Sequence, residues 1–338
     1  LLSAAFATNQ VVAVSNHVAK TTGIHLPLTD PQSPVEVEFQ RLLEQDQDAL
    51  DDADRWIREE EQLAARGAGM GSTALRARIM ERFKPVEQAY EDFIRRHPDH
   101  VRARLAYGSF LNDTGREREA VAQWEKAREL APNNPAAWNN LANYYGHRGP
   151  VMKAFPYYEK AIQLNPAEVV YRRNLAATVS LFRRDAQEYY KLPDDQAVLR
   201  KALELYRQAR QLAPRDFTLA TETAQLYYML KPVPPDDPEA ARRLLAEAMD
   251  AWKAALELAP HDLARQGVYI HMVRTCLNAG DLDQARQYLA KVNHPALEQL
   301  RQLQERRLQR LEHPDQADPS DSSDPSDPPD PPAPAGHP

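Results

Sequence analysis

The sequence predicts an all-α fold in which helix pairs repeat along the chain and stack as an α-solenoid. Three observations predict it. Pro98, Pro132 and Pro166 are separated by 34 residues each time, and a constant spacing of that length indicates a structural repeat. Glycine is scarce, with 11 residues, whereas the 27 prolines concentrate at element boundaries and near the C-terminus, as expected for helices with defined ends. Apolar residues between these prolines recur at helical spacing.

The chain begins with LLSAAFATNQ, residues 1–10, which contains the A-x-A pattern that precedes signal-peptidase cleavage. We therefore interpret residues 1–34 as a signal-peptide remnant followed by an extended segment, and we predict a periplasmic or secreted protein. The alternative is the start of an ordinary apolar helix in a cytoplasmic protein. Thr8, Asn9 and Gln10 interrupt the apolar run well short of the ~18 residues that a membrane span requires, so no transmembrane anchor is predicted.

Residues 35–100 are predicted to form a degenerate helical repeat region ahead of the regular repeats. Residues 35–65 read as an acidic amphipathic helix, and residues 72–97 supply the second helix of the pair. The inward positions of the first helix are Phe39, Leu42, Leu43, Leu50 and Trp56. The connecting GAGMGS, residues 67–72, resembles a phosphate-binding glycine loop, but it follows a charged helix rather than a strand, so no nucleotide site is predicted.

Five phrases of similar sequence end in a proline and mark the repeats. They occupy residues 91–100, 125–134, 159–168, 207–216 and 253–262. In the clearest unit, Gly149 and Pro150 separate two helices that each carry an apolar stripe. Pro156 lies inside the second of these helices and predicts a kink, because proline removes a backbone hydrogen bond.

This pattern resembles the tetratricopeptide repeat family, whose signature is W-x-x-L-G-x-x-Y, then A-x-x-x-F, then P. The matching residues are Trp138, Leu141, Ala142, Tyr145, Gly149, Ala154, Tyr158, Ala161 and Pro166. The preceding unit keeps Gly108, Gly115, Ala120, Trp124, Ala127 and Pro132. Arg104 stands there in place of the first large aromatic, which predicts a weaker contact with the unit before it. The resemblance implies a right-handed α-solenoid of helix-turn-helix repeats.

The predicted repeats cover residues 101–292 and differ in length. Their ranges are 101–134, 135–168, 169–216, 217–262 and a degenerate 263–292. Insertions around residues 186–199 and 230–241 both carry Pro-Asp-Asp. Aspartate before a helical stretch is an N-cap signal, and Pro238 suits a first turn, so the second helices of the third and fourth repeats are predicted to start early and protrude. These extensions either enlarge a binding surface or serve as spacers.

The chain after the repeats divides into a helix and a tail. Residues 293–312 predict an amphipathic helix that caps the last repeat. Its apolar positions are Leu297, Leu300, Leu303 and Leu311. Residues 313–338 contain almost no apolar side chain, so they cannot bury a core and are predicted to be disordered.

Neither a catalytic nor a metal-binding pattern is evident. The sequence contains no HExxH or CxxC, and its only cysteine, Cys276, cannot form an intramolecular disulfide. His97 and His100 flank a helix end and are typical of a solvated turn rather than a metal site. The net charge of −7 provides no cationic field for phosphates. We therefore predict no enzyme, no metal, no cofactor and no nucleic-acid partner.

Polar residues on the first helices are the candidate binding residues. Asn139, Asn143 and His147 follow one another at i, i+4 and i+8, which places them on one helix face. In the tetratricopeptide family such first-helix positions line the concave surface of the solenoid. The resemblance extends this role to Arg102, Leu105, Ser109 and Asn112 in the preceding repeat and to Arg173 and Ala177 in the following one.

Two asparagines add a second candidate feature. Asn140 and Asn174 lie one repeat apart and match the asparagine ladder of some superhelical family members. Their amides either pair with an extended peptide backbone or bond to neighbouring helices. Leu105 stands where the family's carboxylate clamp has a lysine, so that clamp is incomplete.

The sequence therefore predicts a non-enzymatic scaffold or adaptor that binds a peptide or partner protein in its concave groove. The predicted partner-binding residues are Arg102, Ser109, Asn112, Asn139, Asn140, Asn143, His147, Arg173 and Asn174. Replacing Arg102 and Arg173 with glutamate is expected to abolish partner capture without loss of helicity. The alternative is a structural protein that self-associates as a homo-oligomer through its repeat ends or through residues 295–312.

Overall fold

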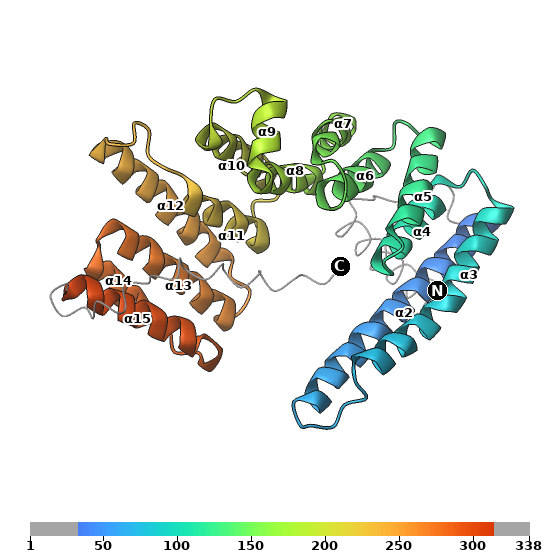
Figure 1. The fold of residues 1–338 in the computed structure, drawn as a ribbon, viewed down its shortest axis with the longest axis horizontal. Coiled ribbons are helices and arrows are strands. Elements are labelled where there is room, and N and C mark those ends of the chain that lie inside the picture. The colour runs from blue at the N-terminus through green and yellow to red at the C-terminus, as the bar shows by residue number, and fades with distance from the viewer. Residues whose placement is uncertain (1–32, 314–338) are drawn as a thin grey trace, which may run out of the picture. The chain divides into compact units, whose positions relative to one another are not determined.

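The computed structural model describes residues 33–313, and these contain helices and no strand (Figure 1). The helices are α2 Pro34–Ala64, α3 Ser72–Arg96, α4 Val101–Asp113, α5 Glu117–Leu130, α6 Pro135–His147, α7 Ala154–Leu164, α8 Val169–Leu181, α9 Arg183–Tyr190, α10 Asp195–Leu212, α11 Phe217–Leu226, α12 Pro238–Leu258, α13 Asp262–Ala279, α14 Leu282–Leu289 and α15 Glu298–Glu312. The predicted all-α class is confirmed. None of the helices in this range combines the length and the apolar character needed to cross a bilayer.

Two predictions fall on parts of the chain outside the described residues. The signal-like pattern occupies residues 1–10, and the low-complexity tail lies almost entirely beyond His313. The periplasmic or secreted location, which rests on the first of these, stays a prediction.

The chain divides into two compact units between Tyr171 and Arg172. In the first unit α2 pairs with α3, α4 with α5 and α6 with α7, and each pair packs on the next. In the second unit α11 pairs with α12 and α13 with α14, α12 packs on α13, and α15 packs on both α13 and α14. This stacking of helix pairs within each unit is the α-solenoid arrangement that the repeat spacing predicted.

The proline phrases both end one helix and start the next. In four phrases the side chain of the residue two positions after the proline accepts a backbone N–H from the first turn of the following helix. These residues are His100, Asn134, Glu168 and Asp216, with donor–acceptor distances of 3.0, 3.0, 3.3 and 2.9 Å. The proline phrase is therefore explained by its role in ending one helix and capping the next, and no ligand is needed to explain it.

Gly108 allows α4 and α5 to approach each other closely. A Cβ atom at Gly108 would lie 2.3 Å from Nε1 of Trp124. Trp124 is buried, and the same nitrogen donates to the carbonyl of Leu105 at 3.3 Å. The glycine of this repeat is thus required by the indole that packs against it.

Arg104 makes the same hydrogen bond as Trp138, which occupies the equivalent position in the next repeat. Nε of Arg104 donates to the carbonyl oxygen of Pro98 at 2.8 Å. Nε1 of Trp138, one repeat later, donates to the carbonyl oxygen of Pro132 at the same distance. A weaker contact at Arg104 was predicted from the loss of aromatic surface alone. The structure shows that the hydrogen bond to the preceding proline carbonyl is kept.

Pro156 lies in the first turn of α7 rather than in its interior, so the loss of a hydrogen bond on which the predicted kink rests does not apply. It is the third residue of α7, which begins at Ala154 after a short 3₁₀ turn over Val151–Lys153. Residues of a first turn have no intrahelical acceptor for their N–H groups, so a proline is tolerated there.

The two Pro-Asp-Asp insertions start helices as predicted. Asp194 caps α10 by accepting the N–H of Ala197 at 2.8 Å, and Asp237 caps α12 with Pro238 at its first position. These helices have 18 and 21 residues, against 14 in α5 and 11 in α7. The first insertion also forms α9, a separate helix that the sequence analysis did not predict.

The apolar face of the last helix differs from the predicted one at Leu311, whereas Leu297, Leu300 and Leu303 are half-buried. Leu308 and Gln304 are buried, with 6% and 1% exposure, whereas Leu311 is 46% exposed. Leu297 precedes α15, in a 3₁₀ turn over Pro295–Leu297. The prediction for Leu311 is wrong because it counted leucines alone, and the face that contacts the preceding helices includes a glutamine.

Candidate functional site

Arg102 lies at a contact between helices rather than on an open surface. Its side chain is 14% exposed, and Nη1 donates to Oε2 of Glu36 on α2 at 2.7 Å. The guanidinium also lies over the ring of Phe39, 5.1 Å from the ring centroid. Burial lowers the pKa of Arg102, and the negative charge of Glu36 opposes that shift. An arginine predicted to hold a partner thus joins α4 to α2.

Arg173 is likewise bonded within the chain. Its Nε and Nη2 donate to the two carboxylate oxygens of Glu222 at 2.8 and 2.5 Å, which joins α8 to α11. The hydrogen bonds to Glu222 raise the pKa of Arg173. Glutamate at Arg102 and Arg173 would therefore break two internal ion pairs and is expected to lower stability. That helicity is kept in this double variant stays a prediction.

The polar line predicted on α6 is exposed only at its end. Asn139 is fully buried, and Asn143 is half-buried and accepts a hydrogen bond from the hydroxyl of Tyr158 at 2.7 Å. His147, at the last position of α6, is exposed. Helical spacing placed the three residues on one face, but it could not reveal what covers that face.

The two ladder asparagines belong to different units. Asn140 is 4% exposed, and its side-chain nitrogen is buried without a hydrogen-bond partner among residues 33–313. Asn174 is half-buried and has contacts of its own. The amide of Asn140 is not accessible to a peptide in this conformation.

The remaining candidates on α4 differ in accessibility. Leu105 is fully buried, so its predicted place on the concave surface is wrong. Ser109 donates to the carbonyl of Leu105 at 3.2 Å, which satisfies its hydroxyl within the helix. Asn112 is exposed, and its amide lies 3.4 Å from the carboxylate of Asp113.

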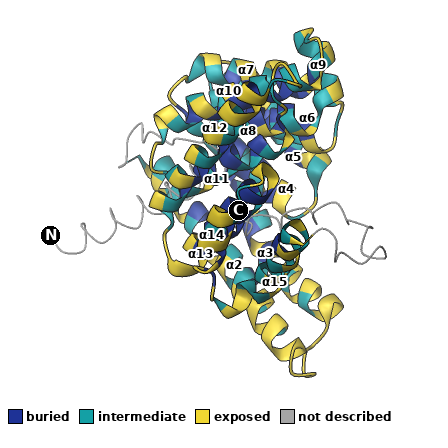
Figure 2. Ribbon diagram, turned by 90° about the vertical axis from the view of Figure 1, so that its left-hand side faces the viewer, coloured by how far each residue is buried: buried dark blue, intermediate teal, exposed yellow. Residues whose placement is uncertain are grey.

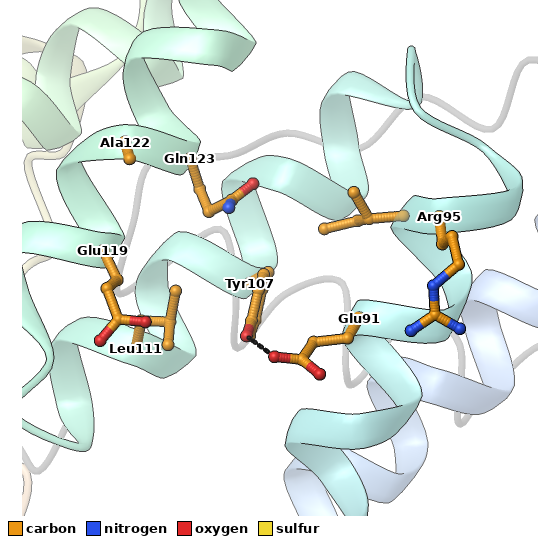
Figure 3. Close-up of a pocket in the computed structure, with 8 residues that line it drawn as sticks. Glu91, Arg95, Tyr107, Leu111, Glu119, Ala122 and Gln123 are labelled. Atoms are coloured by element: carbon orange, nitrogen blue, oxygen red, sulfur yellow. Dashed lines mark hydrogen bonds between the residues drawn. The ribbon is translucent and has the colours of Figure 1, made fainter.

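An open pocket of about 410 Å³ lies in the first unit, where α3, α4 and α5 meet (Figure 3). Eight residues line it: Glu91, Ile94, Arg95, Tyr107, Leu111, Glu119, Ala122 and Gln123. None of the nine predicted binding residues is among them. We refer to this feature as the α3–α5 pocket.

The floor of the α3–α5 pocket is apolar and its sides are acidic. Tyr107 and Leu111 are 5% and 1% exposed, whereas Glu91 and Glu119 are exposed on opposite sides of Tyr107 (Figure 3). The Tyr107 hydroxyl lies 3.4 Å from Oε1 of Glu91. Burial, and then the charges of Glu91 and Glu119, raise the pKa of Tyr107 well above its ordinary value.

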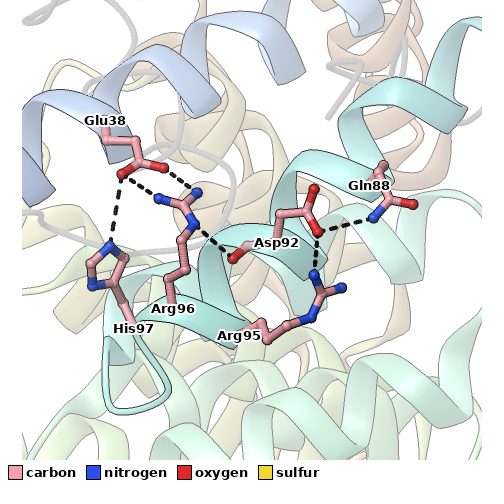
Figure 4. A network of polar contacts seen from close by, with 6 residues as sticks. All are labelled: Glu38, Gln88, Asp92, Arg95, Arg96 and His97. Carbon is pink, nitrogen blue, oxygen red and sulfur yellow. Dashed lines mark hydrogen bonds and ion pairs between the residues drawn. The ribbon is translucent and has the colours of Figure 1, made fainter.

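Arg95, at the rim of the pocket, belongs to a charged network at the end of α3 (Figure 4). Its Nη1 donates to Oδ1 of Asp92 at 2.7 Å, and Gln88 donates to the same oxygen at 3.1 Å. Arg96 donates to both carboxylate oxygens of Glu38 on α2, and this bonding lowers the pKa of Glu38. The charge of Arg95 is therefore directed to Asp92, and the network ties α3 to α2.

The glycine-rich loop between α2 and α3 binds a carboxylate of its own chain. The backbone N–H groups of Met70 and Gly71 donate to Glu60 at 3.1 and 2.7 Å. A Cβ atom at Gly69 would lie 2.5 Å from Oε1 of Glu60. The amide groups that a phosphate would need are already bonded, as expected for a structural turn.

His100 is not in a solvated turn, so that prediction is wrong. Its side chain is 13% exposed, and its ring packs against Phe39 and Phe93 with centroid distances of 4.8 and 5.1 Å. Burial lowers the pKa of His100. Among residues 33–313, no group of three or more histidine, cysteine, aspartate or glutamate side chains is arranged to hold a metal ion.

The α3–α5 pocket is not evident from the sequence, because its residues have patterns typical of other roles. Tyr107 and Leu111 have the i, i+4 spacing of core residues, and Glu91 and Glu119 look like parts of a solvated helix face. A signal was nevertheless present, since Glu91 and Glu119 belong to consecutive second helices. Consecutive second helices are neighbours in a stack of helix pairs.

Part of the chain is similar in sequence to known repeat proteins. Residues 101–144 and 135–168 each match a family model described as tetratricopeptide repeat. The chain is 26% identical over 178 residues to the peroxisomal targeting signal receptor of Pichia angusta, covering 52% of this chain and 27% of the relative. It is 25% identical over 230 residues to the receptor of the same name from Candida albicans, covering 60% and 36%. The chain thus spans about a third of the length of these relatives.

Solved structures of similar fold were also found. The Pseudomonas aeruginosa protein pilF has a TM-score of 0.48 and 15% identity, covering 77% of this chain and 98% of that chain. YrrB, described as a TPR protein with an unusual peptide-binding site, has a TM-score of 0.46 and 16% identity, covering 65% and 99%.

Proposed function

Because the chain is a tetratricopeptide repeat protein, we propose that it is a non-enzymatic scaffold that binds a segment of another protein. The observation that carries this proposal is the α3–α5 pocket, which is open to solvent and is formed by three helices of stacked repeats. Pockets of a few hundred Å³ with an apolar floor and a small number of polar groups are typical of binding sites. The curated relatives are named as receptors of a targeting signal, which supports a protein or peptide as the partner.

The proposal moves the binding surface away from the predicted first-helix positions. Arg102, Arg173 and Asn143 make hydrogen bonds within the chain, and Asn139 and Asn140 are buried. The pocket offers accessible groups without a change of conformation. The concave groove remains a candidate through exposed positions such as Asn112 and His147.

A site-specific crosslink tests whether a partner occupies the pocket. Ala122 lines the pocket and is exposed, so the photoreactive residue p-benzoylphenylalanine can replace it without entering the core. The matched control is Ala241, an exposed alanine on α12. After irradiation in cells that express the full chain, we expect a protein adduct from position 122 that position 241 does not give. Equal labelling at both positions would contradict the proposal.

A second candidate function, self-association, is favoured by the distal part of the α2–α3 hairpin. Between Ala53 and Phe83 no residue is buried, and this hairpin tip, residues 54–82, projects beyond α4 (Figure 2). Four of its apolar side chains are at least 39% exposed: Ile57, Leu63, Met70 and Met80. Contiguous exposed apolar patches mark protein contacts, and we propose that these side chains contribute to one.

Sedimentation velocity of the full chain over a hundredfold range of concentration tests self-association. We expect oligomers that dissociate on dilution, and we expect Ile57→Glu combined with Met80→Glu to abolish them, since charges on an apolar interface are costly. Leu181→Glu, at a residue that is 68% exposed on α8, is the control. A wild-type chain that is monomeric at every concentration would eliminate this candidate.

A further inference from the structure

The α3–α5 pocket has the shape of a site for one long side chain. Its floor consists of the buried faces of Tyr107 and Leu111, and Ile94 and Ala122 form apolar parts of its wall. An alkyl chain lying here would remove its own apolar surface and that of Ile94 and Ala122 from water, while Tyr107 and Leu111 are already buried beneath it. The size and lining therefore suit a flexible apolar stem.

The charged groups that line the pocket indicate the charge of the side chain that it would bind. Glu91 is exposed, and among residues 33–313 it has no ion pair, its one hydrogen bond coming from Tyr107. Glu119 already bonds to Arg116, which also bonds to Glu87. Arg95, the positive group of the lining, is bonded to Asp92. Among the charged residues that line the pocket, Glu91 is thus the one without an ion pair within residues 33–313.

We propose that the α3–α5 pocket binds a lysine or arginine side chain of the partner, with Glu91 as the counter-charge and Tyr107 as the apolar platform. Both cationic side chains combine an apolar stem with a charged end, which matches a floor of Tyr107 and Leu111 beside an exposed carboxylate. A charged hydrogen bond to Glu91 would orient the partner segment. An acidic side chain would meet two carboxylates and be repelled.

This inference rests on the proposed function and names the chemical class of the partner's anchor. Its test uses fluorescein-labelled peptide mixtures that are random except for one central position, fixed as arginine, lysine, glutamine or glutamate. Binding to the full chain is followed by fluorescence anisotropy. We expect the arginine and lysine mixtures to bind about tenfold more tightly than the glutamine mixture, as for a hydrogen bond to a charged group.

Glu91→Gln is the decisive variant, because the side chain is exposed and glutamine can still accept the Tyr107 hydroxyl while it removes the charge. We expect the preference for arginine and lysine over glutamine to fall to about twofold or less. Glu129→Gln, an exposed glutamate on α5 outside the pocket, should keep the full preference. An unchanged preference in Glu91→Gln would overturn the assignment.

The two proposals fail in different ways. If the crosslink at Ala122 captures a partner while the peptides show no preference for a cation, the scaffold function stands and the cationic anchor is wrong. If the cationic mixtures are preferred through Glu91 but no adduct forms at Ala122, the pocket chemistry stands and its use in the cell is wrong.

Discussion

Replacement of Arg102 by glutamate is expected to lower the free energy of unfolding by up to about 3–5 kcal/mol, the range found when a fully buried ion pair loses one partner, because this pair is largely buried. Arg102 and Glu36 are 14% and 11% exposed, and their side chains are joined at 2.7 Å. Glutamate at position 102 would remove the guanidinium from the Phe39 ring and place a second carboxylate beside Glu36. Both changes disfavour the contact of α2 with α4.

The measurement is urea unfolding followed by circular dichroism, with hydrogen exchange of α2 and α4 peptides to locate the change. The control is the charge swap Arg102→Glu with Glu36→Arg, which restores opposite charges across the same contact and should recover most of the loss. His100 lies close by, with Nε2 3.5 Å from Oε1 of Glu36, but burial lowers its pKa and so disfavours a second positive charge beside Glu36. An Arg102→Glu chain as stable as the wild type would show that the pair contributes nothing.

The stability of the first unit is expected to fall as the pH rises from 5 to 7, because of Asp46. The carboxyl group of Asp46 is buried between α2 and α3, its Oδ2 accepts the Tyr90 hydroxyl at 2.6 Å, and its Oδ1 has no partner among the described residues. Burial raises the pKa of Asp46 from 3.8 to about 7, and the nearby charge of Asp113 adds to the shift. The neutral acid therefore suits the folded state better than the carboxylate does.

The sign follows from proton binding. Between the unfolded pKa of 3.8 and the folded pKa of about 7, the folded chain holds a proton at Asp46 that the unfolded chain has lost. Stability from this group is complete below the lower value and is lost as the pH passes through the upper one. At about 1.4 kcal/mol per pH unit, the loss between pH 5 and pH 7 amounts to about 2–3 kcal/mol.

Asp46→Asn isolates this effect from the other titrating groups. Asparagine has the shape of the neutral acid and can still accept the Tyr90 hydroxyl, but it does not titrate. We expect the wild type to lose stability relative to the variant as the pH rises, in urea unfolding measured at pH 5, 6, 7 and 8. A constant difference between the two proteins would mean that Asp46 titrates near its ordinary value.

The period of the prolines was sufficient to predict the helix pairs, because 34 residues are enough for two helices and two turns. The N-caps at Asp194 and Asp237 could also be predicted, since capping depends on neighbours within four residues. Local signals of this kind are visible in the sequence. Asp46 could have been found as well, because it lies on the apolar stripe that contains Leu42 and Leu43.

The candidate site could not be predicted in the same way. The partner of Arg102 is Glu36, which lies 66 residues earlier and outside the repeat period, so the pairing depends on how α2 packs on α4. Tyr107 supplies both a core ring and a pocket floor, and sequence spacing shows only the first role. Burial of Asn139 depends on what packs over α6, which no local pattern reports.

The bonds from Arg104 and Trp138 to the proline carbonyls have a consequence for protein engineering. In α4 and α6 the fourth residue has a side-chain nitrogen that donates to the carbonyl of the preceding proline, and either a guanidinium or an indole provides it. We expect an exchange of arginine and tryptophan between these two positions to keep that bond. Leucine at either position would leave the proline oxygen without this donor.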